Sequence, residues 1–124
     1  MADCELGMGV KMNITVEKYY HEDGKVAVLV SPGYGAGWSS WNRELRLAEF
    51  LLFDRRLVEL VQAQAPEDAA EHLMRELGVD PMPYLGGWKD LEIVWVTPGT
   101  QFRIHEYDGN ETLVRLDVEK YHTA

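Results

Sequence analysis

The distribution of apolar positions predicts a chain with strands at both ends and helices between them. Met12, Ile14 and Val16 alternate with polar residues, which is the pattern of a half-buried strand. After the turn signal at residues 23–24, residues 26–30 are all apolar, and this indicates a short strand buried on both faces. The first thirty residues therefore predict a β-hairpin whose second strand is the more central one.

The middle of the chain has the spacing of amphipathic helices. Asn42 is a candidate N-cap for a helix that starts at residue 43. Asp54 is a candidate cap for a second segment, although one long helix through both segments is the alternative. Pro66 suits the first turn of a third helix, which Gly78 ends. The apolar stripes predict that each helix buries one side.

The last third of the chain returns to strands separated by turn residues. Alternating apolar positions predict strands near residues 91–95 and 102–106, and a short apolar run predicts another at 113–116. The order ββ-ααα-βββ predicts the α+β class, with a mainly antiparallel sheet and helices packed on one face. We expect residues 1–10 to be a flexible tail and residues 11–120 to be a single domain.

Composition narrows the kinds of partner that the chain can bind. It has 124 residues, with 12 basic and 21 acidic side chains and a net charge of -9. This charge disfavours nucleic-acid polymers and anionic membranes, because their binding depends on neutralising phosphates. A few local arginines would still allow a small anionic ligand, and ordinary solubility is the simpler explanation of the acidity.

Cysteine content and hydropathy bear on the compartment. The single cysteine, Cys4, provides neither a disulfide nor a cysteine-based zinc site. The first residues lack a signal-peptide pattern, and no apolar run approaches the length of a membrane span. We therefore expect a cytoplasmic protein.

The stretch most informative about function is the glycine-rich loop after the first apolar run. Gly33, Gly35 and Gly37 lie between a predicted strand and a predicted helix, where backbone amides and a helix start can bind phosphate. The spacing differs from the dinucleotide and P-loop motifs, so tight turns and close packing are the alternative explanation. Three aromatic side chains in the loop would suit stacking on a purine base.

The candidate ligand-binding residues come from this loop, from an arginine beside it, and from two later segments. An arginine can bind phosphate through two hydrogen bonds, and an aromatic residue in a loop can contact a ring. Core packing or surface charge is the alternative for each of them. The full set is Gly33, Tyr34, Gly35, Ala36, Gly37, Trp38, Ser39, Ser40, Trp41, Arg43, Trp88 and Arg103.

The sequence has no pattern typical of a catalytic or metal centre. The four histidines lack metal-ligand spacing, so we expect neither a metal nor another cofactor. The serines of the glycine loop do not form a nucleophile elbow. Glu106 and Asp108 would suit acid–base work, but a turn at residues 107–109 is the preferred interpretation. We therefore expect a protein without catalytic activity, with an enzyme as the alternative.

Several motifs occur in a fixed order along the chain. They are residues 33–39 of the glycine loop, the segment 54–61, the helix end at 76–78, the strand pair 91–94 and 102–104, and the Glu-Tyr-Asp-Gly turn at 106–109. Over residues 25–115 this order resembles a family of small, mostly uncharacterised bacteriophage proteins. The chain departs from the family in its N-terminal extension and longer N-terminal strand. The resemblance implies a viral context rather than a mechanism.

A phage context suggests two functions of different classes. The first is an anti-defence protein in the host cytoplasm that sequesters a nucleotide immune signal without catalysis. The signal would be a cyclic nucleotide or an ADP-ribose derivative, held by the glycine loop. The second is an acidic inhibitor of a host defence complex, similar to an anti-CRISPR protein, in which the loop is only structural. An enzyme that degrades the signal is a further alternative.

The alternating N-terminal segment also bears on assembly. An apolar face formed by Met12, Ile14 and Val16 needs cover, and a second copy of the chain would provide it. The sequence therefore predicts a homo-oligomer that binds a small anionic, nucleotide-like ligand.

Overall fold

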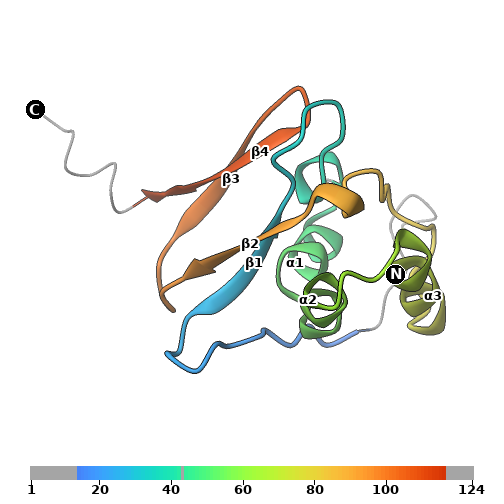
Figure 1. The fold of residues 1–124 in the computed structure, drawn as a ribbon, viewed down its shortest axis with the longest axis horizontal. Helices are drawn as coiled ribbons and strands as arrows, with labels where there is room; N and C mark the ends of the chain where they lie inside the picture. The colour runs from blue at the N-terminus through green and yellow to red at the C-terminus, as the bar shows by residue number, and fades with distance from the viewer. Residues whose placement is uncertain (1–13, 43, 117–124) are drawn as a thin grey trace, which may run out of the picture.

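The secondary structure follows the α+β class and the element order that the sequence predicts. The computed structural model describes residues 14–42 and 44–116. Two short 3₁₀ helices, Ser39–Trp41 and Trp88–Asp90, lie in the connecting loops. The main elements, drawn in Figure 1, are β1 (Val26–Val30), α1 (Leu45–Phe53), α2 (Arg55–Gln62), α3 (Glu67–Glu76), β2 (Glu92–Val96), β3 (Phe102–Tyr107) and β4 (Asn110–Arg115).

The strands form two small antiparallel sheets instead of one continuous sheet. β1 pairs with β2, from Val26↔Val96 to Val30↔Glu92, although the three helices separate these strands in the sequence. β3 pairs with β4 as a hairpin. Figure 1 shows this hairpin on one side of β1 and β2, and the helices on the other side.

β1 is buried on both faces, as the apolar run predicts. Ala27 and Leu29 point into the main core cluster, which includes Phe50 and Leu51 of α1. Val28 and Val30 belong to a second cluster, against which Phe102, Ile104 and Leu113 of the β3–β4 hairpin pack. Because successive side chains of a strand point to opposite faces, β1 joins the helical layer to the hairpin.

The expected first strand is reduced to isolated bridges in its described part. Residues 14–20 pair through Lys18↔Asp54 and Tyr20↔Val26. The segment leaves β1 to reach the corner between α1 and α2, so a continuous ladder with β1 does not form. Met12 lies outside the described residues, whereas Ile14 and Val16 pack against the main core cluster. Their apolar side chains are thus covered by the chain itself, and the homo-oligomer stays a prediction.

Capping residues set the ends of the helices. Glu44 caps α1 in place of the predicted Asn42, since its carboxylate accepts a hydrogen bond of 2.9 Å from the backbone nitrogen of Leu47. Asp54 caps α2 as predicted, and its extended backbone makes α1 and α2 two helices. Gly78 follows α3 with a φ of 80°, a conformation that favours glycine at a helix end.

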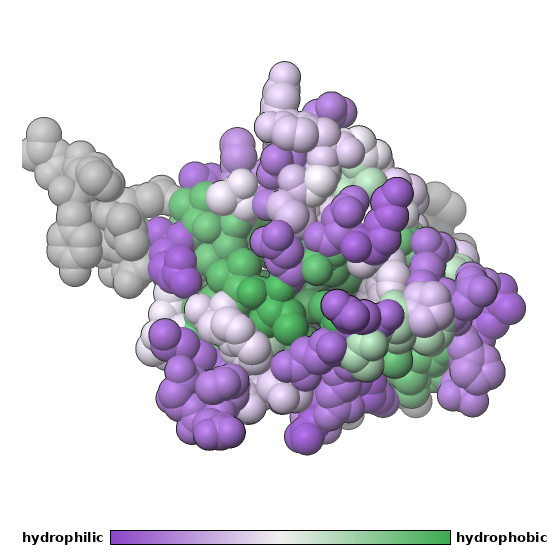
Figure 2. Space-filling model, in the orientation of Figure 1, coloured by the Kyte–Doolittle hydropathy of each residue, from purple (hydrophilic) through white to green (hydrophobic). Residues whose placement is uncertain are grey.

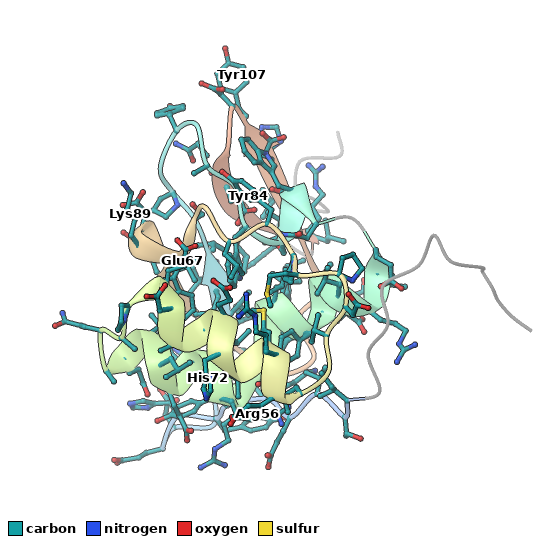
Figure 3. All side chains as sticks on the ribbon, turned by 90° about the vertical axis from the view of Figure 1, so that its right-hand side faces the viewer. Arg56, Glu67, His72, Tyr84, Lys89 and Tyr107 are labelled. Carbon is teal, nitrogen blue, oxygen red and sulfur yellow. The ribbon has the colours of Figure 1, made fainter. Side chains whose placement is uncertain are left out.

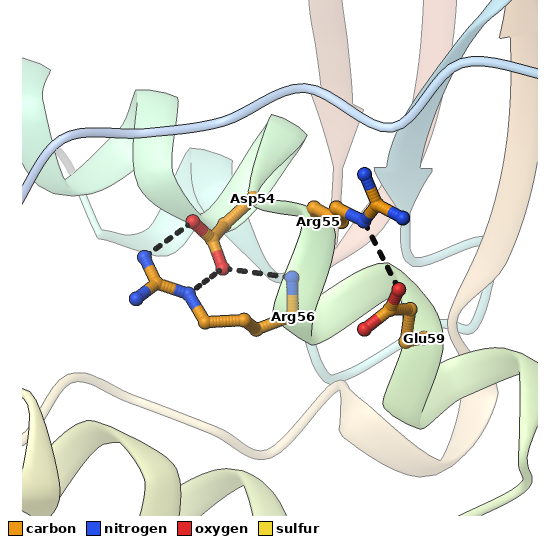
Figure 4. Close-up of polar contacts among 4 residues, drawn as sticks. All are labelled: Asp54, Arg55, Arg56 and Glu59. Atoms are coloured by element: carbon orange, nitrogen blue, oxygen red, sulfur yellow. Dashed lines mark hydrogen bonds and ion pairs between the residues drawn. The ribbon is translucent and has the colours of Figure 1, made fainter.

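An ion pair with one buried partner fixes the corner between α1 and α2 (Figure 4). Asp54 is fully buried. Its carboxylate accepts hydrogen bonds from the backbone nitrogen, Nε and Nη2 of Arg56, at 3.0, 3.0 and 2.9 Å. The hydrogen bond to Asp54 raises the pKa of Arg56 above its ordinary value. The neighbouring pair of Arg55 and Glu59 is half exposed, with 3.1 Å between Nε and Oε2.

These two ion pairs should differ in their contribution to stability. Replacing Asp54 by alanine should lower the free energy of unfolding by about 2–3 kcal/mol, because α2 loses its cap and Arg56 its buried partner. The matched truncation Glu59→Ala, on the same helix, should cost at most about 0.5 kcal/mol. Urea denaturation at neutral pH measures both values. Equal losses in the two variants would contradict the assignment.

Candidate functional site

The glycine loop, residues 31–42, lies against the turn between β3 and β4 (Figure 1). The backbone nitrogen of Gly35 donates a hydrogen bond of 2.5 Å to the carbonyl oxygen of Asp108. The backbone nitrogen of Glu111 donates one of 2.7 Å to the carbonyl oxygen of Ser31. Within the loop, the Ser31 hydroxyl donates to the carbonyl oxygen of Ala36 at 2.7 Å. The loop is therefore held to the hairpin at two places.

A buried carboxylate occupies the backbone amides of this loop. Glu111, on β4, is only 3% exposed. Its Oε2 accepts hydrogen bonds from the backbone nitrogens of Trp38 and Ser40, at 2.7 and 3.0 Å, and from the Ser40 hydroxyl at 2.5 Å. Its Oε1 accepts a hydrogen bond of 3.0 Å from the backbone nitrogen of Ser31. The loop thus has converging amides, as an anion site does, and the anion is Glu111.

Two of the predicted ligand-binding tryptophans are core residues. Trp38 is fully buried, and its indole nitrogen donates a hydrogen bond of 2.8 Å to the carbonyl oxygen of Leu51. Trp88 is 5% exposed and donates in the same way to Ala65, also at 2.8 Å. Their ring centroids lie 5.9 Å apart. For these two residues the structure agrees with the core-packing alternative.

Trp41 and Tyr84 form a pair of rings on the surface, which we call the ring pair. They are 38% and 41% exposed, with ring centroids 5.1 Å apart and planes at 44°. The indole nitrogen of Trp41 donates a hydrogen bond of 3.1 Å to Oε2 of Glu106. Asn42 is buried and binds both backbone groups of Tyr84, donating to the carbonyl oxygen at 3.0 Å and accepting from the nitrogen at 2.9 Å. It therefore joins the loop to the segment that carries Tyr84.

Two glycines allow the rings of this pair to lie directly on the backbone. A Cβ atom at Gly37 would fall 2.6 Å from the ring of Trp41. A Cβ atom at Gly86 would overlap the ring and hydroxyl of Tyr84. No other residue fits either place without moving a ring, so glycine is required for close packing.

Two more exposed tyrosines flank the contact between the glycine loop and the β3–β4 turn. Tyr34 and Tyr107 are 70% and 72% exposed, and each is next in sequence to a residue of the hydrogen bond between Gly35 and Asp108. Figure 3 shows Tyr107 at the tip of the β3–β4 hairpin and Tyr84 below it, away from His72 and Arg56 on the helices. We call Tyr34, Tyr107 and the ring pair the aromatic end.

The remaining predicted site residues fall in several places. Gly33 lies beside Asp90, whose Oδ2 is 2.9 Å from the position of a Cβ atom at that glycine. Ser39 is buried in the short 3₁₀ helix. Arg103 is exposed on β3, near the end of the hairpin opposite Tyr107. Arg43 lies outside the described residues.

Sequence reasoning missed Tyr84, the role of Asn42 in holding it, and the carboxylates of Glu106 and Glu111 at the loop. The two glycines that follow Leu85 were a usable signal for Tyr84, because glycine permits another group to approach the backbone closely. Glu111 has no such local signal, since its partners are 71 to 80 residues away in the sequence.

A hollow lined by residues of β1, β2 and β3 lies at another part of the surface. It has a volume of about 360 Å³ and includes Val28, Phe53, Val96 and Phe102 in its lining. Figure 2 shows apolar side chains, in green, gathered on the face that contains the strands. This hollow contains none of the residues of the aromatic end, so it is a separate feature.

Similarity to known proteins gives no indication of the function of this chain. The chain matches no family model, no curated protein and no solved structure. Within residues 14–42 and 44–116, no helix has the length and apolar character to cross a membrane. In the same part of the chain, no group of three or more His, Cys, Asp or Glu residues is placed to hold a metal ion. The function must therefore be argued from the site itself.

The carboxylate of Glu111 should be essential for the closed loop. Glutamine at this position has one acceptor oxygen, and its amide hydrogens would face the loop amides. Glu111→Gln should therefore lower the free energy of unfolding by about 2–4 kcal/mol. Glu49→Gln, at an exposed position of α1, should change it by less than about 0.5 kcal/mol. Urea denaturation followed by tryptophan fluorescence measures both variants, and equal stability of the two would overturn this role of Glu111.

Proposed function

We propose that this protein is a non-catalytic binding protein whose aromatic end contacts another protein. The observation that carries the proposal is the fixed position of the ring pair, held half-exposed by two glycines and by Asn42. Tryptophan and tyrosine are enriched at the energetic centres of protein interfaces. Rings that are already fixed lose little conformational entropy on binding, so they suit such a centre.

The charges around the loop favour a protein partner over a nucleotide. Glu106 hydrogen-bonds to Trp41, and Asp90 lies beside Gly33. A phosphate at this place would meet these carboxylates, in a chain whose net charge is -9. The amides of Trp38 and Ser40, which would offset that repulsion, already bind Glu111. An acidic inhibitor of a host defence complex, acting in the host cytoplasm, is thus the favoured form of the proposal.

Capture of a partner from a bacterial lysate should depend on Trp41. Trp41→Ala should reduce the recovery of a specific partner at least about tenfold, as expected when a central aromatic residue of an interface is removed. The matched control is Tyr20→Ala, because Tyr20 is 57% exposed but pairs with Val26, at the end of β1 far from the loop.

The outcome is measured by mass spectrometry of the captured proteins, with thermal unfolding to verify that both variants are folded. Equal loss in both variants, or no loss in either, would contradict the proposal.

Sequestration of a nucleotide immune signal is the second candidate function. It is favoured by one observation, the exposed ring pair, since an aromatic side chain can stack on any base. If the protein binds a nucleotide, the base would lie on the ring of Trp41 and the phosphates would extend away from the carboxylate of Glu106.

A thermal-shift screen tests this second function. The ligands are cyclic dinucleotides, cyclic ADP-ribose isomers and ADP-ribose. A true ligand at about one hundred times its dissociation constant should stabilise the protein by about 2.7 kcal/mol, and Trp41→Ala should abolish the shift. If every ligand leaves the unfolding temperature unchanged, nucleotide sequestration is wrong.

A further inference from the structure

The hollow beside β1, β2 and β3 has the size and the interior of a small-molecule site. Its volume of about 360 Å³ is near the lower end of the usual range for such sites. The buried side chains of Val28 and Val96 are part of its lining, together with the half-buried rings of Phe53 and Phe102. The centroids of these two rings lie 6.0 Å apart, with their planes at 72°. The hollow therefore offers apolar contacts from α1 and from three strands.

The described lining of this hollow has one basic side chain, that of Lys18, and no acidic one. The other lining residues are Tyr20, Val26 and the turn residues 97–100. The Nζ atom of Lys18 lies 4.9 Å from the centroid of the Phe53 ring, a distance at which the ring attracts the ammonium. An ammonium has three hydrogens to donate, so contact with a ring leaves it able to bind an acceptor as well.

Among the described residues, Lys18 has no carboxylate as an ion-pair partner. Asp54 lies opposite it in an isolated bridge, but both oxygens of that carboxylate accept hydrogen bonds from Arg56. The hydrogen bond to Asp54 is the main cause of the raised pKa of Arg56, and the charge of Glu17 contributes to it. Both nearby carboxylates thus act on Arg56, and the ammonium of Lys18 is available to an anion from outside the chain.

Other charged residues at this end of the strands do not enter the hollow. The neighbouring turn contains Asp23, whose carboxylate accepts a hydrogen bond of 3.0 Å from the backbone nitrogen of Lys25. Arg103 follows Phe102, and Arg115 is opposite Phe102 in the strand register. None of these four charged residues is in the lining, so Lys18 gives the hollow its charge. The net charge of -9 disfavours a multiply charged anion, whereas a singly charged one matches this lysine.

From these observations we propose that the hollow binds a monocarboxylic acid with an unbranched apolar tail. The carboxylate pairs with the ammonium of Lys18, and the tail lies against the rings of Phe53 and Phe102. A charge-assisted hydrogen bond selects the acid group, and burial of the methylene groups supplies affinity. The hollow contains no residue of the aromatic end, so this site is additional to the proposed protein-binding function and does not depend on it.

Valine methyl resonances in two-dimensional NMR test the inference. The probe is octanoate at neutral pH, below the concentration at which it forms micelles. Octanol has the same chain length without the charge. Octanoate should shift the methyl signals of Val28 and Val96 and bind about tenfold more tightly than octanol. Hexanoate should bind about tenfold more weakly than octanoate, because it has two fewer methylene groups to bury.

Two buried valines and a second lysine provide the controls. The methyl signals of Val58 and Val79 should stay unchanged, because these residues belong to the main core cluster. Lys18→Met keeps an apolar side chain but removes the charge, so it should weaken octanoate binding about tenfold and leave octanol binding unchanged. Lys89→Met removes the same charge at an exposed position outside the hollow, and octanoate should bind this variant as it binds the wild-type protein.

Three results would each overturn the inference. Equal affinity of the wild-type protein for octanoate and octanol would show that the charge is not recognised, and this comparison needs no variant. No shift of Val28 and Val96 at millimolar octanoate, or an equal shift of Val58, would exclude the hollow as the site. Equal effects of Lys18→Met and Lys89→Met would contradict the role of Lys18. None of these results affects the dependence of partner capture on Trp41, so the two proposals fail independently.

Discussion

The structure around the glycine loop depends on one carboxylate, that of Glu111. Its two oxygens bind Ser31, where β1 ends, and Trp38 and Ser40, where the loop enters a short helix. Buried amides without partners would cost several kcal/mol together, so the loop needs an acceptor at this place to close. Once it is closed, Trp38 can pack in the core, and the β3–β4 hairpin is fixed over β1. One side chain thus determines the relative positions of the loop, a core tryptophan and the second sheet.

Because Glu111 occupies its backbone amides, the glycine loop has a structural role. Its amides, which in other proteins would receive a phosphate, are used inside the molecule. What the loop presents to solvent is aromatic, because Gly37 and Gly86 provide flat backbone on which the rings of Trp41 and Tyr84 lie. Asn42 then links the two segments through the backbone of Tyr84.

Local features of the fold could be predicted from the sequence, and features that join distant segments could not. The apolar run 26–30 is typical of a strand covered on both faces, and Asp54 and Gly78 act within one turn of their helix ends. Asn42 was expected to cap the helix that follows it, but its side-chain amide donates a hydrogen bond to the carbonyl oxygen of Tyr84, 42 residues later. Glu111 lies in the polar stretch 108–112, which directly follows strand β3 and gives no sign of a buried position. Its burial follows from the position of the loop, which no short stretch of sequence specifies.

The long sequence separations within the central layer also affect how the chain can fold during synthesis. β1 pairs with β2, and the three helices lie between them in the sequence. The three helices are therefore synthesised before β2, so the sheet against which they pack is still incomplete at that stage. The glycine loop closes later still, because its backbone amides bind the carboxylate of Glu111, which is synthesised 80 residues after Ser31. Contacts of this range close slowly, so β1 completes its pairing only after the three helices and β2 have been synthesised.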